Sequence, residues 1–177
     1  IAEMLQFSDQ LAHPDLSDPE FSVVTPIYIT LGEKAYGISA GYGELHLTIR
    51  TWTEKEMEKL ENQMLEGLQE IAKKHQLPFR HEWSHVFQAN RNAAEPYSWV
   101  EKMVQQRNLK HLYREYPFKW GEDFGAFTQE YPGAMFGIGA GEDCPALHNP
   151  DYDFPDALIE YGVTAMTGIL EELHDLK

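Results

Sequence analysis

The fold is decided by residues 44–75, which read ELHLTIRTWTEKEMEKLENQMLEGLQEIAKKH. The first part alternates between apolar and polar side chains, the period of a half-buried β-strand, and predicts a strand over 44–52 with Leu45, Leu47 and Ile49 on one face. The second part switches to helical spacing and predicts a helix over 53–75, which Thr53 and Glu56 would open as a capping box. The apolar stripe of this helix consists of Met57, Leu60, Met64, Leu68, Ile71 and Ala72.

The neighbouring segments extend this pattern to an α+β arrangement. Residues 1–12 have the apolar spacing of the end of an amphipathic helix. Residues 21–31 predict a second strand, in which Pro26 favours an edge position or a bulge. One face of that strand is expected to carry Val23, Ile27, Ile29 and Leu31. Residues 79–88 alternate again and predict a third strand, so the order helix, strand, strand, helix, strand indicates a sheet with helices on one side.

The second half of the chain has a different pattern. A helix is predicted over 96–107, with Trp99, Val100 and Met103 facing inward. The short apolar run AMFGIG, 134–139, predicts a buried strand. A last helix is expected to begin at Pro155, because proline suits the first turn of a helix. Its apolar positions at helical spacing are Leu158, Tyr161, Ala165, Ile169 and Leu173.

Composition excludes several classes of partner. The formal net charge is −15, so nucleic acids and anionic membranes would be repelled. No apolar run reaches the roughly 20 residues that span a bilayer. The single cysteine, Cys144, rules out an internal disulfide and fits a cytoplasmic protein. The chain opens at Ile1 within an apolar helical pattern, so we expect these 177 residues to be a piece of a longer protein.

His81-Glu82-Trp83-Ser84-His85 matches the HExxH motif of zinc proteases. That motif works on a helix, where histidines four residues apart share one face. Here the surrounding residues alternate with the period of a strand, on which such positions lie roughly 13 Å apart. Two Zn–N bonds of about 2 Å cannot bridge that separation, so two accessory histidines on a half-buried strand are the favoured interpretation and an HExxH protease the alternative.

The segment 121–156 places glycine-rich and acidic turns around one histidine, His148, just before the last helix. Loops present functional side chains, and imidazole is the commonest metal ligand in proteins. A surface-turn histidine is the competing interpretation. Cys144 precedes His148 by four residues and could join it in a metal site or a nucleophilic pair, although a lone loop thiol is the simpler explanation.

Three further features have both a functional and an ordinary interpretation. The glycine-rich run 137–141 suggests a phosphate loop, but it lacks the Lys-Ser/Thr ending, which favours a tight turn. Glu122 and Asp123 could form a carboxylate pair or the first turn of a helix. Arg50 ends the polar face of the strand 44–52, where its guanidinium could bind a carboxylate in bidentate fashion or simply be solvated.

The combination GEDF, PGAMFGIGAG and LHNPDYDFPD in residues 121–156 resembles the C-terminal signature of the zinc-dependent aminoacylase and carboxypeptidase family, family twenty of the metallopeptidases. Within that family, the pattern resembles that of hippurate-hydrolase-like N-acyl-amino-acid amidohydrolases. The earlier stretch 35–60, with its strand ending in Thr48-Ile49-Arg50-Thr51 before a long helix, is similar to the lid segment of that family.

This resemblance implies an α/β protein with two domains. Residues 1–91 would form a ferredoxin-like lid and dimerisation domain that lacks its first strand. Residues 92–177 would be the C-terminal part of the catalytic domain. The resemblance further implies that His148 binds a divalent metal, zinc or manganese, that Arg50 binds the carboxylate of the substrate, and that Gly139 lies in a turn lining the substrate pocket.

Two departures from the family pattern limit what the chain can do alone. Gly37 stands where relatives have an asparagine, thirteen residues before the arginine. The other metal ligands and the glutamate base of the family precede the lid and are not among these residues. We therefore expect a fragment of an amidohydrolase for N-acyl amino acids or small peptides, inactive by itself and dimeric through the lid. A non-catalytic dimerisation or binding module is the alternative.

Overall fold

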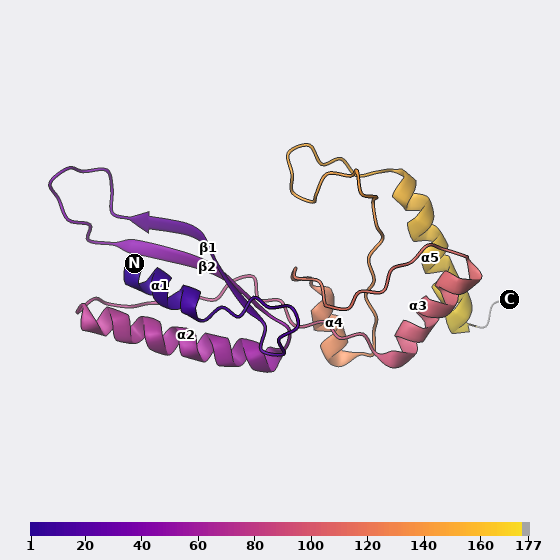
Figure 1. Ribbon diagram of the computed structural model, residues 1–177, viewed down its shortest axis with the longest axis horizontal. Helices are drawn as coiled ribbons and strands as arrows, with labels where there is room; N and C mark the ends of the chain where they lie inside the picture. The colour runs from indigo at the N-terminus through magenta and orange to yellow at the C-terminus, as the bar shows by residue number, and fades with distance from the viewer. Residues whose placement is uncertain (175–177) are drawn as a thin grey trace. The chain divides into compact units, whose positions relative to one another are not determined.

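The computed structural model describes residues 1–174 and is of mixed α and β structure, as predicted. Its elements are α1 (Ala2–Gln10), β1 (Ser22–Leu31), β2 (Gly43–Thr51), α2 (Glu54–Lys74), α3 (Ala94–Gln106), α4 (Phe124–Glu130) and α5 (Ala157–His174) (Figure 1). They fall into two compact units. The first comprises Ile1–Ala89 and Arg114–Gly121, and the second comprises Asn90–Tyr113 and the residues from Glu122 onward.

The sheet of the first unit is an antiparallel hairpin of β1 and β2. Directly opposite residues include Val24 and Ile49, and Pro26 and Leu47. The register shifts between Pro26 and Tyr28, which is the bulge that the proline favoured. The face predicted for this strand was wrong in part. Val24, not Val23, is buried, and Val23 lies opposite Arg50 on the other face.

The core of the first unit lies between this hairpin and the long helix α2. Val24 packs with Leu60, Met64 and Leu68, all of which are buried. Partly buried side chains complete the cluster from α1, β2 and the segment after α2: Met4, Phe7, Leu11, Leu47, Ile49 and Phe79. The predicted strand and helix therefore pack as their apolar faces require, with α1 and α2 on the same side of the hairpin (Figure 1).

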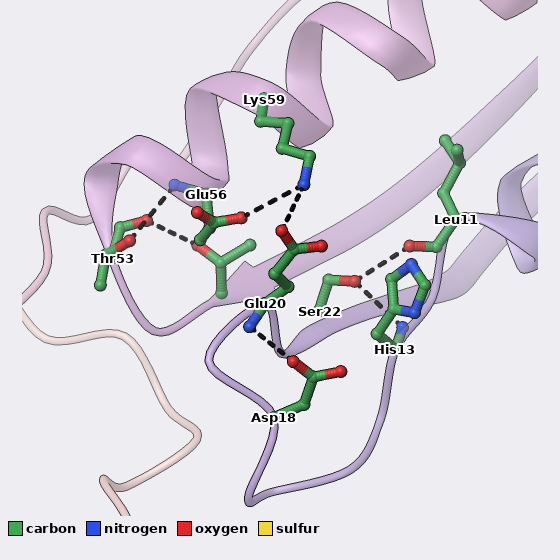
Figure 2. A network of polar contacts seen from close by, with 9 residues as sticks. Leu11, His13, Asp18, Glu20, Ser22, Thr53, Glu56 and Lys59 are labelled. Carbon is green, nitrogen blue, oxygen red and sulfur yellow. Dashed lines mark hydrogen bonds and ion pairs between the residues drawn. The ribbon is translucent and has the colours of Figure 1, made fainter.

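Of the two hydrogen bonds in the predicted capping box of α2, the one accepted by Thr53 is present. The amide of Glu56 donates to Thr53 Oγ1 at 3.2 Å, which satisfies one of the free amides of the first turn. Figure 2 shows the Glu56 carboxylate turned to Lys59, whose Nζ lies 3.8 Å from it and 2.9 Å from Glu20. The start of α2 is thereby tied to the loop that leads into β1.

That loop is also held to α1 through Ser22. Its hydroxyl donates to the carbonyl of Leu11 at 2.9 Å and accepts from the amide of His13 at 3.0 Å (Figure 2). Ser22 is only 4% exposed, so both contacts replace solvent around a buried hydroxyl. Beside it, the rings of Phe21 and Trp52 stack at 3.9 Å and close the open end of the hairpin.

A side chain of helix α1 lies very close to the backbone of α2 at Gly67. A Cβ atom at this position would lie 1.9 Å from Cζ of Phe7, so the ring of Phe7 rests directly on the glycine. Gly67→Ala is expected to lower the free energy of unfolding by about 1 kcal/mol, because overpacking costs about 1–3 kcal/mol and the gain in helix propensity returns only about 1 kcal/mol. Urea unfolding measures the difference.

This contact can be tested because removal of the Phe7 ring should reverse the sign of the effect of Gly67→Ala on the free energy of unfolding. In a Phe7→Ala background, Gly67→Ala should stabilise the protein by about 1 kcal/mol, because only the propensity gain remains. The exposed Gln69 on the same helix provides a control, and Gln69→Ala should have little effect. Stabilisation by Gly67→Ala in both backgrounds would show that Phe7 does not pack on this glycine.

The third strand predicted over 79–88 is not formed. These residues follow α2 without a ladder partner anywhere in the described range. The centroid of the His81 ring nevertheless lies 6.2 Å from that of Phe79 and 6.1 Å from that of Trp83. These alternate side chains therefore share one side of the segment, as the pattern suggests. The prediction was wrong because a strand needs a neighbouring strand as well as an alternating pattern, and residues 81–88 are exposed.

The second unit is organised by the packing of α3 against α5 (Figure 1). Met103 of α3 is buried and rests on Gly168 of α5, where a Cβ atom would lie 2.6 Å from its Cγ. Both helices were predicted, although α5 begins at Ala157 rather than Pro155. Within residues 1–174, no helix has the length and apolar character needed to cross a membrane.

The strand predicted over 134–139 is also absent. Instead, the side chain of Asn92 forms two hydrogen bonds with the backbone of Met135, each 2.9 Å long. Asn92 Nδ2 donates to the Met135 carbonyl, and Asn92 Oδ1 accepts from the Met135 amide. Ala93 donates to the carbonyl of Gly133 at 2.8 Å. From Gly137 to Ala140 the run is exposed, because no other strand of the described chain lies beside it.

Candidate functional site

His148 occupies the third position of a tight turn. The turn is closed by the amide of Asn149, which donates to the carbonyl of Ala146 at 3.1 Å. The φ angle of His148 is 70°, in the left-handed region that turns of this kind usually fill with glycine or asparagine. A second turn, closed by Tyr152 donating to Asn149, follows directly. The two turns present an exposed imidazole on a sharply folded backbone.

The backbone of His148 is unusual for its place in the fold. Four residues other than glycine have positive φ in residues 1–174, namely Gln76, His85, Asn108 and His148. Gln76 and Asn108 directly follow the ends of α2 and α3, where a left-handed residue is a common way to stop a helix. His85 and His148 follow no helix end, so this explanation applies to neither of them. A strained residue in a loop is a recognised indication of a functional position.

A hollow of about 490 Å³ lies beside this turn, between the loop and the start of α5. Its lining is largely apolar: Ile138, Ala140, Gly141, Cys144, Pro145, Leu147, Tyr152, Phe154, Leu158, Ile159 and Gly162. Leu147, the neighbour of His148, is part of that lining. The sequence analysis did not identify this cavity, although apolar residues such as Leu147 and Phe154 inside a polar, glycine-rich loop were a signal for it.

Gly139 lies between two residues of that lining, Ile138 and Ala140. It is exposed, and a Cβ atom there would meet no atom within 4 Å. Gly141 has a φ of 98°, which indicates a turn at the end of the glycine-rich run. Cys144 is half-buried and lines the cavity. The structure thus places Gly139, Cys144 and His148 in one loop segment of the second unit.

Glu122 and Asp123 do not lie in the first turn of a helix, the ordinary role suggested for them, but immediately before it. They precede α4, and their carbonyls accept from the amides of Gly125 and Ala126 at 3.3 and 3.0 Å. Asp123 is the cap residue of that helix. Hydrogen bonding at the start of a helix is therefore the structural role of this pair.

Arg50 lies in the first unit, on the polar face of the hairpin. Its neighbours along β2 on that face are Thr48, His46 and Glu44, as the alternation predicted. The guanidinium is exposed, and within residues 1–174 it forms no ion pair. It is therefore available to an external carboxylate.

A small polar cluster lies at the other end of the same face. The hydroxyl of Tyr42 donates to Glu44 Oε1 at 2.5 Å, and His46 Nε2 lies 3.2 Å from Glu44 Oε2. The hydrogen bond from Tyr42, and then that from His46, lowers the pKa of the Glu44 carboxyl. The same contact with Glu44 raises the pKa of the Tyr42 hydroxyl. The alternation of residues 44–52 places Glu44 and His46 on the polar face, but it gave no signal for this cluster.

Gly37 lies in the loop between the two strands and has a φ of 82°. A Cβ atom there would meet nothing within 4 Å. Asparagine tolerates the left-handed region better than most residues, so the backbone and the surrounding space would accept the residue expected there from the resemblance. The glycine is thus not required by crowding.

The HExxH segment has no helix. His81 lies in the segment that follows α2, outside any helix, and His85 lies at a bend of that segment with a φ of 53°, in the left-handed region. The geometry that lets two histidines of this motif grip one zinc ion is therefore missing. More generally, residues 1–174 bring together no group of three histidine, cysteine, aspartate or glutamate side chains that could hold a metal ion.

Comparison with known proteins gives one consistent result. The chain is 28% identical over 156 residues to the N-acetyldiaminopimelate deacetylase of Bacillus subtilis (strain 168), which covers 86% of this chain and 40% of the relative. Its identity to the protein of the same name from Limosilactobacillus reuteri (strain DSM 20016) is 28% over 149 residues, 81% of this chain and 39% of the relative. The N-acetyldiaminopimelate deacetylase of Lactobacillus acidophilus is 24% identical over 148 residues, which cover 80% of this chain and 38% of the relative.

No protein-family model and no solved structure matches the chain. The relatives are named as deacetylases rather than as hippurate hydrolases. The chain is thus similar to N-acetyldiaminopimelate deacetylases over most of its length, and it spans about 40% of the length of these curated relatives.

Proposed function

We propose that these residues are the C-terminal part of a metal-dependent amidohydrolase that removes the acyl group from an N-acyl amino acid. The supporting observation is the similarity to proteins named N-acetyldiaminopimelate deacetylase, which extends over 86% of the chain in one relative. The substrate class that follows from that name is an N-acetylated amino acid with at least one free carboxylate. The first 91 residues would be the lid and dimerisation domain, and the remainder would belong to the catalytic domain.

The residues present fit only part of a metal site. His148 offers an exposed imidazole, which suits one ligand position of zinc or manganese. A catalytic zinc has about three protein ligands, and residues 1–174 do not bring three together. The other ligands must therefore come from outside these residues. When bound, the ion would supply Lewis-acid activation of the amide carbonyl.

The residues of this chain would bind and orient the substrate. Arg50 would bind the carboxylate, because its guanidinium is exposed and free of ion pairs in residues 1–174. Gly139 would leave room beside the cavity, since no atom lies within 4 Å of its absent side chain. The apolar lining of the cavity would take the aliphatic part of the substrate and keep water away from it.

The test is an assay of the protein translated from the complete reading frame. With added Zn²⁺ or Mn²⁺ it should release acetate and a free amine from N-acetyldiaminopimelate or from other N-acetyl amino acids, and a chelator should stop the reaction. The 177-residue chain alone should hydrolyse none of them, because its residues 1–174 bring together no group of three side chains that could hold the metal.

Two outcomes would contradict the proposal. Hydrolysis by the 177-residue chain alone would show that the site is built differently. Tight binding of N-acyl amino acids by the complete protein without turnover, at any metal concentration, would favour the non-catalytic binding module instead.

A further inference from the structure

Glu44 and His46 form a pair of potential metal ligands on the polar face of β2. They are two positions apart on the strand, so both side chains lie on the same face. His46 Nε2 lies 3.2 Å from Glu44 Oε2, and the two side chains are 49% and 41% exposed. An imidazole nitrogen and a carboxylate oxygen are therefore held side by side where a dissolved ion can reach both.

The separation of these two atoms fits a single zinc ion. Zn²⁺ binds imidazole nitrogen and carboxylate oxygen at about 2.0–2.2 Å and prefers tetrahedral geometry. Two ligand atoms at that distance from one ion, and at the tetrahedral angle, lie about 3.3–3.5 Å from each other. The 3.2 Å between His46 and Glu44 is close to this value, so little movement of either side chain is needed for an ion to bind both.

Two tyrosines hold the pair in this arrangement. The hydroxyl of Tyr42 donates to Glu44 Oε1 at 2.5 Å, which leaves Oε2 to the ion. Tyr28, which lies opposite His46 on β1, packs edge-on against the imidazole with the ring centroids 5.2 Å apart. Neighbours that orient the ligands in this way contribute to the affinity of a metal site.

A second glutamate–histidine pair in the chain differs in a respect that matters for a cation. His75 Nε2 lies 2.7 Å from Glu3 Oε2, and these side chains are 51% and 40% exposed. Lys74 Nζ, however, lies 2.6 Å from the other oxygen of Glu3, and its positive charge would repel a divalent cation. Within residues 1–174, Glu44 forms no ion pair with a lysine or arginine.

We propose that Glu44 and His46 form a binding site for a divalent transition metal, with Zn²⁺ as the ion that fits best. The imidazole favours zinc over Mg²⁺ and Ca²⁺, which take oxygen ligands. Water would complete the coordination, because residues 1–174 supply no third histidine, cysteine or carboxylate here. This limits the affinity, as does Arg80, whose charge acts on the nearby Tyr42 hydroxyl.

Protection of individual histidines from chemical modification would locate the ion. The protein from the complete reading frame is treated with diethyl pyrocarbonate with and without added Zn²⁺, and mass spectrometry gives the modification rate of each histidine. At a free Zn²⁺ concentration ten times the Kd, His46 should react about tenfold more slowly, because only about a tenth of the sites are then empty. His75 should react at the same rate with and without Zn²⁺, because Lys74 opposes binding there.

Substitutions test the two ligands separately. Glu44→Gln and His46→Gln should each weaken this Zn²⁺-binding step by more than about 10-fold in calorimetric titration, because each removes a ligand of the ion. Tyr42→Phe removes only a supporting hydrogen bond and should have a smaller effect of the same sign. Glu3→Gln is the matched control, because it makes the same change in the pair that Lys74 blocks, and it should leave the binding step unchanged.

The proposal would be overturned by equal protection of His46 and His75, by no protection of His46, or by unchanged Zn²⁺ binding in the Glu44→Gln protein. None of these measurements follows hydrolysis. His148→Asn should leave the protection of His46 unchanged, so a failure of this proposal can be told apart from a failure of the proposed function.

Discussion

Replacement of His148 by asparagine in the complete protein is expected to abolish the proposed deacetylation while leaving the fold as stable as before. The loss of activity should exceed about 100-fold, since even residues that only support a metal ligand cost 10–100-fold when removed. Bound metal should fall in parallel. Stability should not fall, because asparagine tolerates the left-handed backbone of a turn, which His148 adopts with a φ of 70°.

Asparagine is chosen because it removes the imidazole without disturbing the turn, so the effect of losing the ligand is measured separately from any effect on the backbone. Alanine at this φ would be strained, and a loss caused by the turn itself could be mistaken for a loss of the ligand. His111, another exposed histidine of the same unit, provides the control, and His111→Asn should leave metal content and rate unchanged. Full metal content with normal turnover in the His148→Asn protein would show that this imidazole is not a ligand.

Replacement of Arg50 by alanine is expected to lower kcat/KM for N-acetyl amino acids by roughly 10–100-fold. A hydrogen bond to a charged group contributes about 1.5–3 kcal/mol, and each 1.4 kcal/mol is a factor of ten. Arg50→Lys should retain only part of the kcat/KM, because the lysine ammonium cannot form the two parallel hydrogen bonds that a guanidinium makes to a carboxylate. The measurement is steady-state kinetics of the complete protein with the three side chains in turn.

A substrate without the carboxylate makes this prediction specific. With the corresponding N-acetyl amino acid amide, Arg50→Ala should change kcat/KM little, because the group that the arginine recognises is missing. Arg80, exposed on the segment after α2, provides a control for the loss of one positive charge. Equal losses with both substrates would assign Arg50 a structural role instead.

The elements that could be predicted from the sequence are those whose partners lie close by in the chain. The hairpin and α2 form one continuous run of residues, and the apolar positions Leu47, Ile49, Leu60 and Leu68 contact one another as their periods require. Pro26 even indicated the bulge, because a residue without an amide hydrogen cannot complete the ladder. Local spacing contains enough information for such contacts.

The predictions that were wrong concern segments that depend on a distant neighbour. Residues 79–88 and 134–139 have strand-like patterns, but no strand of the described chain pairs with either. The spacing of apolar residues shows which face of a segment is apolar, but it does not show which other segment will pack against or pair with it. The left-handed φ of His148 and the cavity beside it were not visible either, because both arise from how a loop of mixed composition folds back on α5.

The hairpin has a consequence for the behaviour of the chain in concentrated solution. From Val23 onward the outer edge of β1 has no strand beside it in residues 1–174, and Ile27, Ile29 and Leu31 on this strand are between 42% and 64% exposed. An uncovered edge with apolar side chains is a template on which another molecule can add a strand, the first step of aggregation. The bulge at Pro26 interrupts this template near its middle, so growth from the edge would meet a break in the ladder there.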